Sequence, residues 1–165
     1  MLDSQSTLAA LLAAPVRPGR LMWIGLRPAR GAPMQAVQRV RALTAQGLEG
    51  DRYRTSSNGK RQVTLIQAED LAAIASYLGR DEVLAGEVRR NLLTRGINLL
   101  ALKGKRFRVG EALLEYSGEC HPCSKMETLF GTGGYNAMRG HGGITARILE
   151  DGLICLGDAV EVLPG

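Results

Sequence analysis

The second half of the chain is built from short runs of β-forming residues separated by tight turns, and this pattern limits the folds open to it. Glycine and aspartate stand between the runs, as in Asp151-Gly152 and Gly157-Asp158. The runs cover residues 106–109, 112–117, 144–149, 153–156 and 159–163. Short strands at such spacing are typical of hairpins in a barrel or sandwich. Strands and helices do not alternate along the chain as a doubly wound sheet requires.

The first half adds predicted strands at residues 20–26 and 62–66 and one amphipathic helix. The apolar stripe of this helix follows the i, i+3, i+4, i+7 spacing and consists of Leu71, Ile74, Ala75 and Leu78. Glu69 and Asp70 occupy its first turn and Gly79 its C-terminal cap. Residues 34–43 are compatible with both extended and helical periods.

We therefore predict a mainly β fold of the α+β kind, with a few short helices. Residues 1–19 form a loose or weakly helical lead-in, and residues 20–165 form a single domain. A chain of 165 residues is long enough to bury a core of its own.

Charge and composition restrict the partners. The net charge of +5 is modest and suits a small anionic ligand. Aromatic residues make up only 4% of the chain, which makes nucleic acid an unlikely partner because few rings are available to stack on bases. The longest apolar stretches fall short of the roughly 18 residues of a membrane span, so we expect no membrane partner. An odd count of three cysteines and a start without a positive leader region favour a cytoplasmic protein.

The segment from Cys120 to Lys125 is the strongest candidate for chemistry. Cys123 follows a proline and begins a predicted helical turn, where free backbone amides, His121 and Lys125 would stabilise a thiolate. Cys123 is accordingly the predicted nucleophile or metal ligand. Two alternatives stay open: the two cysteines are half-buried packing residues, or they form a dithiol redox pair in which Cys120 is the resolving thiol. A closed zinc site lacks a second pair of ligands.

Two glycine-rich stretches and several cations lie near this segment in the sequence. The stretches at residues 131–134 and 140–143 predict an anion nest, to which Gly133, Gly134 and Arg139 would contribute, although a plain surface loop is as compatible with them. Arg89, Arg90 and Asn91 lie in a β-like stretch between Gly86 and Gly96, and Arg61 precedes another predicted strand. Guanidinium groups bind phosphate and carboxylate, so Arg61, Arg90 and Asn91 are candidate cofactor-binding residues.

An ordered set of motifs resembles the MOSC domain family, named for the C-terminal domain of molybdenum cofactor sulfurases. The similarity runs from about residue 20 to residue 163. The motifs are Gly47-Leu48-Glu49-Gly50-Asp51-Arg52, Arg61-Gln62-Val63-Thr64-Leu65-Ile66, Arg90-Asn91-Leu92, Pro122-Cys123 and the closing Gly157-Asp158.

The resemblance implies a MOSC-type β-barrel and a molybdenum–pterin cofactor. It also implies that Cys123 either ligates molybdenum or carries sulfur as a persulfide, with Arg61, Arg90 and Asn91 around the cofactor pocket. Members of the family reduce N-hydroxylated compounds, which is the activity that we predict first. The chain has no aminotransferase-like domain, so we expect no pyridoxal phosphate on it. Electrons or sulfur would come from a donor protein.

Overall fold

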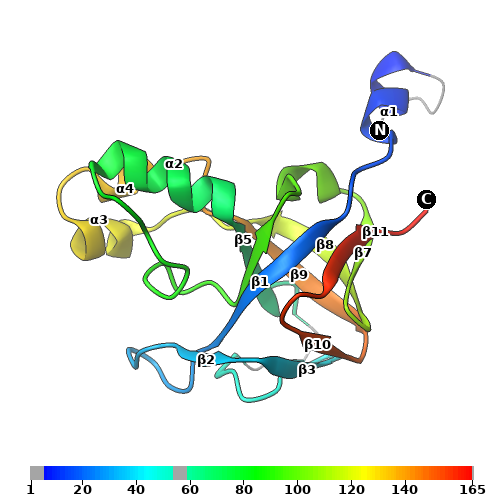
Figure 1. Cartoon of the computed structure of the whole chain (residues 1–165), viewed down its shortest axis with the longest axis horizontal. Coiled ribbons are helices and arrows are strands. Elements are labelled where there is room, and N and C mark those ends of the chain that lie inside the picture. The colour runs from blue at the N-terminus through cyan, green and yellow to red at the C-terminus, as the bar shows by residue number, and fades with distance from the viewer. Residues whose placement is uncertain (1–5, 54–58, 165) are drawn as a thin grey trace.

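Seven strands form a closed barrel in the structure, a computed structural model that describes residues 6–53 and 59–164 (Figure 1). In spatial order the strands run β11, β7, β8, β9, β5, β6 and β1, and β1 pairs with β11 to close the ring. Their bounds are β1 Gly19–Leu26, β5 Val63–Gln67, β6 Leu92–Arg95, β7 Arg106–Val109, β8 Ala112–Glu119, β9 Ile144–Glu150 and β11 Ala159–Val162. The predicted mainly β barrel is confirmed.

Only one pairing among the described strands is parallel, that of β5 with β6. A parallel pair needs a crossover, and α2 (Ala68–Leu78) supplies it. The short strand β2 (Gln35–Val37) extends the pairing of β1. A separate three-stranded sheet holds β10 (Gly152–Cys155), β3 (Arg39–Leu43) and β4 (Gly47–Leu48).

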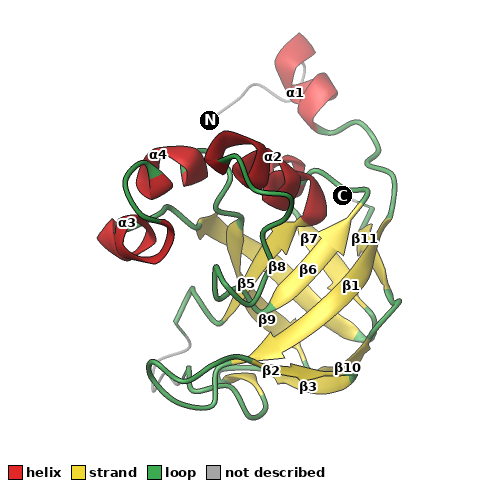
Figure 2. Cartoon of the chain, turned by 60° about the vertical axis from the view of Figure 1, so that its left-hand side comes forward, coloured by secondary structure: helices red, strands yellow, loops and turns green. Residues whose placement is uncertain are grey.

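Two apolar clusters hold the fold together. The larger one fills the barrel, with Phe107 as its largest fully buried side chain. The second lies outside the barrel wall, where Leu71 and Ile74 of α2 pack with Ile66 of β5 and with residues of α3 (Ser124–Phe130) and α4 (Gly134–Met138). Figure 2 shows these three helices grouped on one side of the barrel. Helix position is therefore fixed by the outward face of β5.

The N-terminal helix α1 (Thr7–Leu12) stands apart from both clusters. It contributes no buried residue and projects away from the barrel in both views (Figures 1 and 2). The first five residues of the predicted lead-in lie outside the described part of the chain. A short 3-10 helix, η1 (Leu99–Leu102), follows β6. None of the described helices combines the length and the apolar character that crossing a membrane requires.

The sequence-based elements largely match the structure, with two corrections. The amphipathic helix is confirmed, including its left-handed C-cap at Gly79. The prediction of a β-like stretch at Arg89-Arg90-Asn91 is wrong, because these residues form a turn and an approach to β6, and Arg89 has a φ of 59° that no strand accommodates. The glycine loops also contain a helix that was not predicted, α4, between them.

A buried polar network joins β1 to the strands β5 and β6. Asp51 is fully buried and its carboxylate accepts hydrogen bonds from Arg27 through the backbone N at 2.7 Å, Nε at 3.2 Å and Nη2 at 2.9 Å. The Nδ2 of Asn91 donates to Asp51 at 3.3 Å and to the carbonyl of Gly25 at 3.0 Å. On its other side, the Oδ1 of Asn91 accepts from the backbone N and the hydroxyl of Thr64. The Asp51 carboxylate and the Asn91 amide both have hydrogen-bond partners, as their burial requires.

We predict that Asp51→Ala lowers the free energy of unfolding by about 3–5 kcal/mol at neutral pH, because it leaves the Arg27 guanidinium without its partner. Burial acts to raise the pKa of Asp51, but the hydrogen bonds and the charge of Arg27 outweigh it and lower this pKa overall. Such a carboxylate stabilises the fold above about pH 4 and loses this contribution as the pH falls further.

Chemical denaturation between pH 3 and pH 8 measures the effect. The difference between the wild type and Asp51→Ala should shrink on the acid side. The matched control is Asp81→Ala at an exposed acid, which should change stability by less than about 0.5 kcal/mol. A pH-independent difference would contradict the assigned ion pair.

Candidate functional site

The barrel register brings together segments that are far apart in the sequence. One row of paired residues crosses five strands: Glu119 pairs with Ile144, Ile144 with Leu65, Leu65 with Leu92, and Leu92 with Ile24. Cys120, Gly143 and Asn91 each lie one residue from this row. The candidate site is therefore assembled where β8 ends and where β9 and β6 begin.

Arg90 is the central cation of this region. Its residue exposure is only 8%, and its guanidinium donates from Nε to the carbonyl of Gly142 at 2.8 Å and from Nη1 to the carbonyl of Val88 at 2.6 Å. Within the described ranges, Arg90 forms no ion pair with a carboxylate. A buried charge neutralised only by carbonyl dipoles is costly, which makes it a candidate for binding an anion.

Burial and nearby charges act on the pKa of Arg90 in opposite directions. Burial lowers the pKa of Arg90 below its ordinary value; negative charge at Cys120 and Cys123 acts to raise it, and the charges of Arg27 and Arg61 act to lower it. A guanidinium nevertheless stays protonated at neutral pH. Arg61 adds a second, exposed cation to this region.

The two cysteines occupy different environments. Cys123 is exposed and is the N-cap residue of α3, as predicted, with its carbonyl accepting from Met126 N at 2.9 Å. Cys120 is buried, and its backbone N donates to the carbonyl of Gly143 at 2.8 Å. His121 and Lys125 are exposed on either side of Cys123. Only Cys123 therefore offers an accessible sulfur in this segment.

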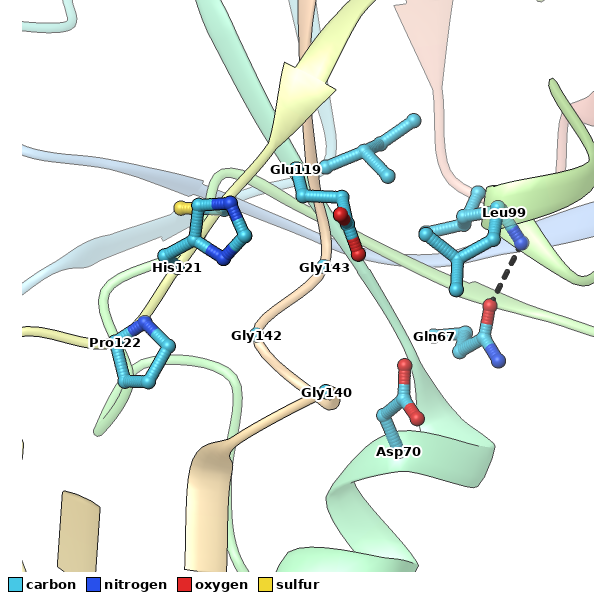
Figure 3. Close-up of a pocket in the computed structure, with 12 residues that line it drawn as sticks. Gln67, Asp70, Leu99, Glu119, His121, Pro122, Gly140, Gly142 and Gly143 are labelled. Atoms are coloured by element: carbon cyan, nitrogen blue, oxygen red, sulfur yellow. Dashed lines mark hydrogen bonds between the residues drawn. The ribbon is translucent and has the colours of Figure 1, made fainter. Parts of the chain in front are cut away.

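A small pocket lies beside these residues (Figure 3). Cys120, His121 and Pro122 line one side of it, and Gly140, Gly142 and Gly143 line another. Acidic groups complete the lining, with Asp70 from α2 and Glu119 from the end of β8. Figure 3 also shows Gln67, which accepts a hydrogen bond from Leu99 N at 2.8 Å.

The first glycine stretch is arranged differently from the predicted anion nest. The backbone N of Gly133 and of Tyr135 donate to the two carboxylate oxygens of Glu127, each at 3.0 Å. Glu127 also accepts from the N of Gly134, and these bonds lower the pKa of the Glu127 carboxyl. An internal carboxylate thus lies where the prediction places phosphate. Arg139 is exposed at the end of α4.

Asn91 was predicted as a cofactor-binding residue, but the structure places it fully buried with its amide engaged in the network around Asp51, so it supports the adjacent Arg90 through the chain. Gly142, whose carbonyl holds Arg90, and the pair of Asp70 with His141 were not predicted as functional groups. The available signal was the glycine stretch at residues 140–143, which the sequence analysis interprets as part of an anion nest.

The class of protein follows from this architecture and is supported by comparison with known families. The model of the MOSC domain matches residues 45–161, and the chain belongs to the MOSC domain family. A search of the curated proteins returns no match.

Solved bacterial structures share the fold. The YuaD protein from Bacillus subtilis aligns with a TM-score of 0.78 at 17% identity over 89% of this chain and 96% of that one. YiiM from Escherichia coli gives 0.67 at 23% identity over 87% and 69%, and YiiM from Geobacillus stearothermophilus gives 0.70 at 18% over 88% and 75%. At these identities the likeness concerns the fold.

The contrast in burial predicts selective alkylation. Under native conditions iodoacetamide should modify Cys123 at least about tenfold faster than Cys120, because reagents reach a buried thiol only after local opening. Peptide mass spectrometry over a time course measures both rates. Cys123→Ser should remove the fast reaction and Cys120→Ser should retain it. Equal rates at the two positions would contradict the arrangement.

Proposed function

We propose that the protein binds a molybdenum–pterin cofactor and uses it to reduce N-hydroxylated substrates. The observation that carries the proposal is the buried Arg90 guanidinium, which is bound to the carbonyls of Val88 and Gly142, while Gly142 packs against Cys120 in the segment that also holds the exposed Cys123. An anionic group with a soft metal satisfies both features, since thiolates ligate soft metals and guanidinium groups bind phosphate.

The donor set of the chain is compatible with such a cofactor. Among the described residues there is no group of three or more His, Cys, Asp or Glu side chains that could hold a metal ion. A metal here would therefore take one ligand, the Cys123 sulfur, from the protein and the others from its own cofactor. Arg61 and Arg90 would face the anionic part of the cofactor, and exposed Arg139 would add charge at longer range.

In this proposal the cofactor, Cys123, Arg90 and His121 each have a separate role in the reduction. When bound, the cofactor would supply a two-electron redox centre. Cys123 would hold the metal, and Arg90 would stabilise the negative charge of the cofactor. Reduction breaks the N–O bond, consumes two electrons and two protons, and releases water. His121 is exposed beside Cys123 and can donate one of these protons to the leaving oxygen from a ring nitrogen.

A donor protein must supply the electrons, because the chain itself carries no second redox group in this scheme. The modest net charge of +5 would favour an acidic donor.

A second candidate function is that of a sulfur carrier, and the exposure of Cys123 favours it. In this role the Cys123 thiolate would attack the outer sulfur of a persulfide on a donor protein, which breaks the donor's S–S bond, releases the donor's thiol and leaves a persulfide on Cys123. Lys125 and His121 flank the sulfur and would stabilise its charge. A dithiol oxidoreductase requires two reachable sulfurs, and the burial of Cys120 disfavours it.

Elemental analysis of protein purified from a host that makes the cofactor tests the first function. We expect molybdenum at a large fraction of sites in the wild type, and none in Cys123→Ser, which should also lose N-hydroxy reduction. Cys120→Ser should keep much of both properties and lose any reversible oxidative inactivation. Protein without molybdenum from such a host would contradict the proposal.

Intact-mass measurement separates the second function from the first. A mass increase of one sulfur atom, removed by a reductant and absent in Cys123→Ala, would establish the carrier role. Equal loss of activity in Cys120→Ser and Cys123→Ser would instead restore the dithiol mechanism.

A further inference from the structure

We propose that Asp70 and His141 are positioning residues that hold the Gly140–Gly143 segment in place, so that the Gly142 carbonyl keeps the Arg90 guanidinium next to the cysteine segment, residues 120–125. The inference deepens the proposed function and rests on it for the identity of the bound ligand. The link between His141 and Arg90 can be tested on the protein without any ligand.

The pair of Asp70 and His141 anchors one side of the segment. The Nδ1 of His141 lies 2.7 Å from the Oδ1 of Asp70, in the first turn of α2. The imidazole also contacts the ring of Tyr77, with 5.5 Å between the ring centroids, and its backbone N donates to the carbonyl of Met138 at 2.8 Å. Both side chains of the pair are partly buried, at 28% and 18% exposure, so solvent screens the contact only in part.

The segment next to this anchor packs closely against its neighbours, so even a small shift would break its contacts. A Cβ on Gly142 would lie 2.1 Å from the carbonyl oxygen of Cys120. A Cβ on Gly143 would lie 2.0 Å from the carbonyl oxygen of Leu65, and its φ of 86° is one that L residues rarely adopt. The backbone of Gly142 and Gly143 therefore packs directly against Cys120 on one side and Leu65 of β5 on the other. Figure 3 shows this passage of the glycines between Asp70 and His121.

At Gly142 the segment contacts the Arg90 guanidinium. The carbonyl of Gly142 accepts from Arg90 Nε, and the Nη2 of Arg90 would lie 3.5 Å from a Cβ on the same glycine. A displaced Gly142 would leave Arg90 with the Val88 carbonyl as its remaining partner among the described residues. The guanidinium would then turn toward solvent, and the positive charge next to the cysteine segment would be weakened.

The structure thus connects the His141 imidazole to Arg90 through the Asp70–His141 contact and the hydrogen bond from Arg90 to the Gly142 carbonyl. The charge of Arg90 would in turn act on an ionised Cys123. A packed path alone does not demonstrate coupling. The experiment must therefore detect the charge at Cys123, which a merely structural role of His141 would leave unchanged.

Two alkylating reagents of similar size provide such a readout. Iodoacetate is an anion that Arg90 attracts, whereas iodoacetamide is neutral. The ratio of their rates at Cys123 reports the local positive charge, and it is insensitive to general loosening because loosening raises both rates. Assignment to Cys123 comes from peptide mass spectrometry.

We expect the iodoacetate-to-iodoacetamide ratio at Cys123 to fall about five- to tenfold in His141→Ala. His141→Asn places an amide donor near the position of Nδ1 and should retain the ratio within about twofold. Tyr77→Leu removes the ring contact and keeps the hydrogen bond, so it is the matched control and should leave the ratio unchanged. Thermal unfolding of each variant verifies that the fold persists.

A double-mutant cycle with Arg90→Met completes the test. If His141 acts through Arg90, adding His141→Ala to Arg90→Met changes the ratio no further. The comparison of His141→Ala with His141→Asn stands even if the Arg90 variant does not fold. An unchanged ratio in His141→Ala, or equal falls in His141→Ala and His141→Asn, would overturn the inference.

The outcomes also separate this inference from the proposed function. A protein that lacks molybdenum but shows the fall in ratio would refute the cofactor and retain the positioning role. A protein that holds molybdenum and shows no change in ratio would refute the positioning role alone.

Discussion

The buried carboxylate of Asp51 is the contact on which the candidate site depends. It holds the backbone and the guanidinium of Arg27 at the end of β1 and the amide of Asn91 before β6. Asn91 is in turn bound to Thr64 of β5, so the only parallel pairing of the described strands is fixed at its start. Arg90 directly precedes Asn91, and its burial is a consequence of this arrangement. A network whose own charges, Asp51 and Arg27, are paired thus supports Arg90, a cation without a carboxylate partner in the part of the chain that the structure describes.

Local patterns predicted the elements whose structure is decided within a few residues. The stripe from Leu71 to Leu78 determined α2, and the alternation around Phe107 determined β7, because each depends on a period and a capping residue. The proline before Cys123 likewise indicated the start of α3. The closure of the barrel depends on contacts between distant strands, and the resemblance to the MOSC family, rather than periodicity, predicted it.

The site was harder to predict because its polar groups pair over long distances in sequence. The glycine stretch around Gly133 has the residues of an anion nest, but its amides are occupied by Glu127, which nothing in the local pattern indicates. Arg89 and Arg90 look equivalent in the sequence. In the structure a left-handed turn separates them: Arg89 donates to the Ala32 carbonyl, and Arg90 reaches the Gly142 carbonyl, 52 residues later in the chain.

The pairing of β1 with β11 also affects how the protein can form during synthesis. Gly19 pairs with Val160, so β1 cannot complete its pairing in the barrel before β11 has been synthesised. The ring cannot close until the residues of β11 have left the ribosome, about 140 residues after β1, and contacts this distant in sequence slow folding. Until then the edges of β1 and β7 are open and can pair with other chains. Chaperone binding during translation would therefore matter most for this protein in the interval just before β11 emerges.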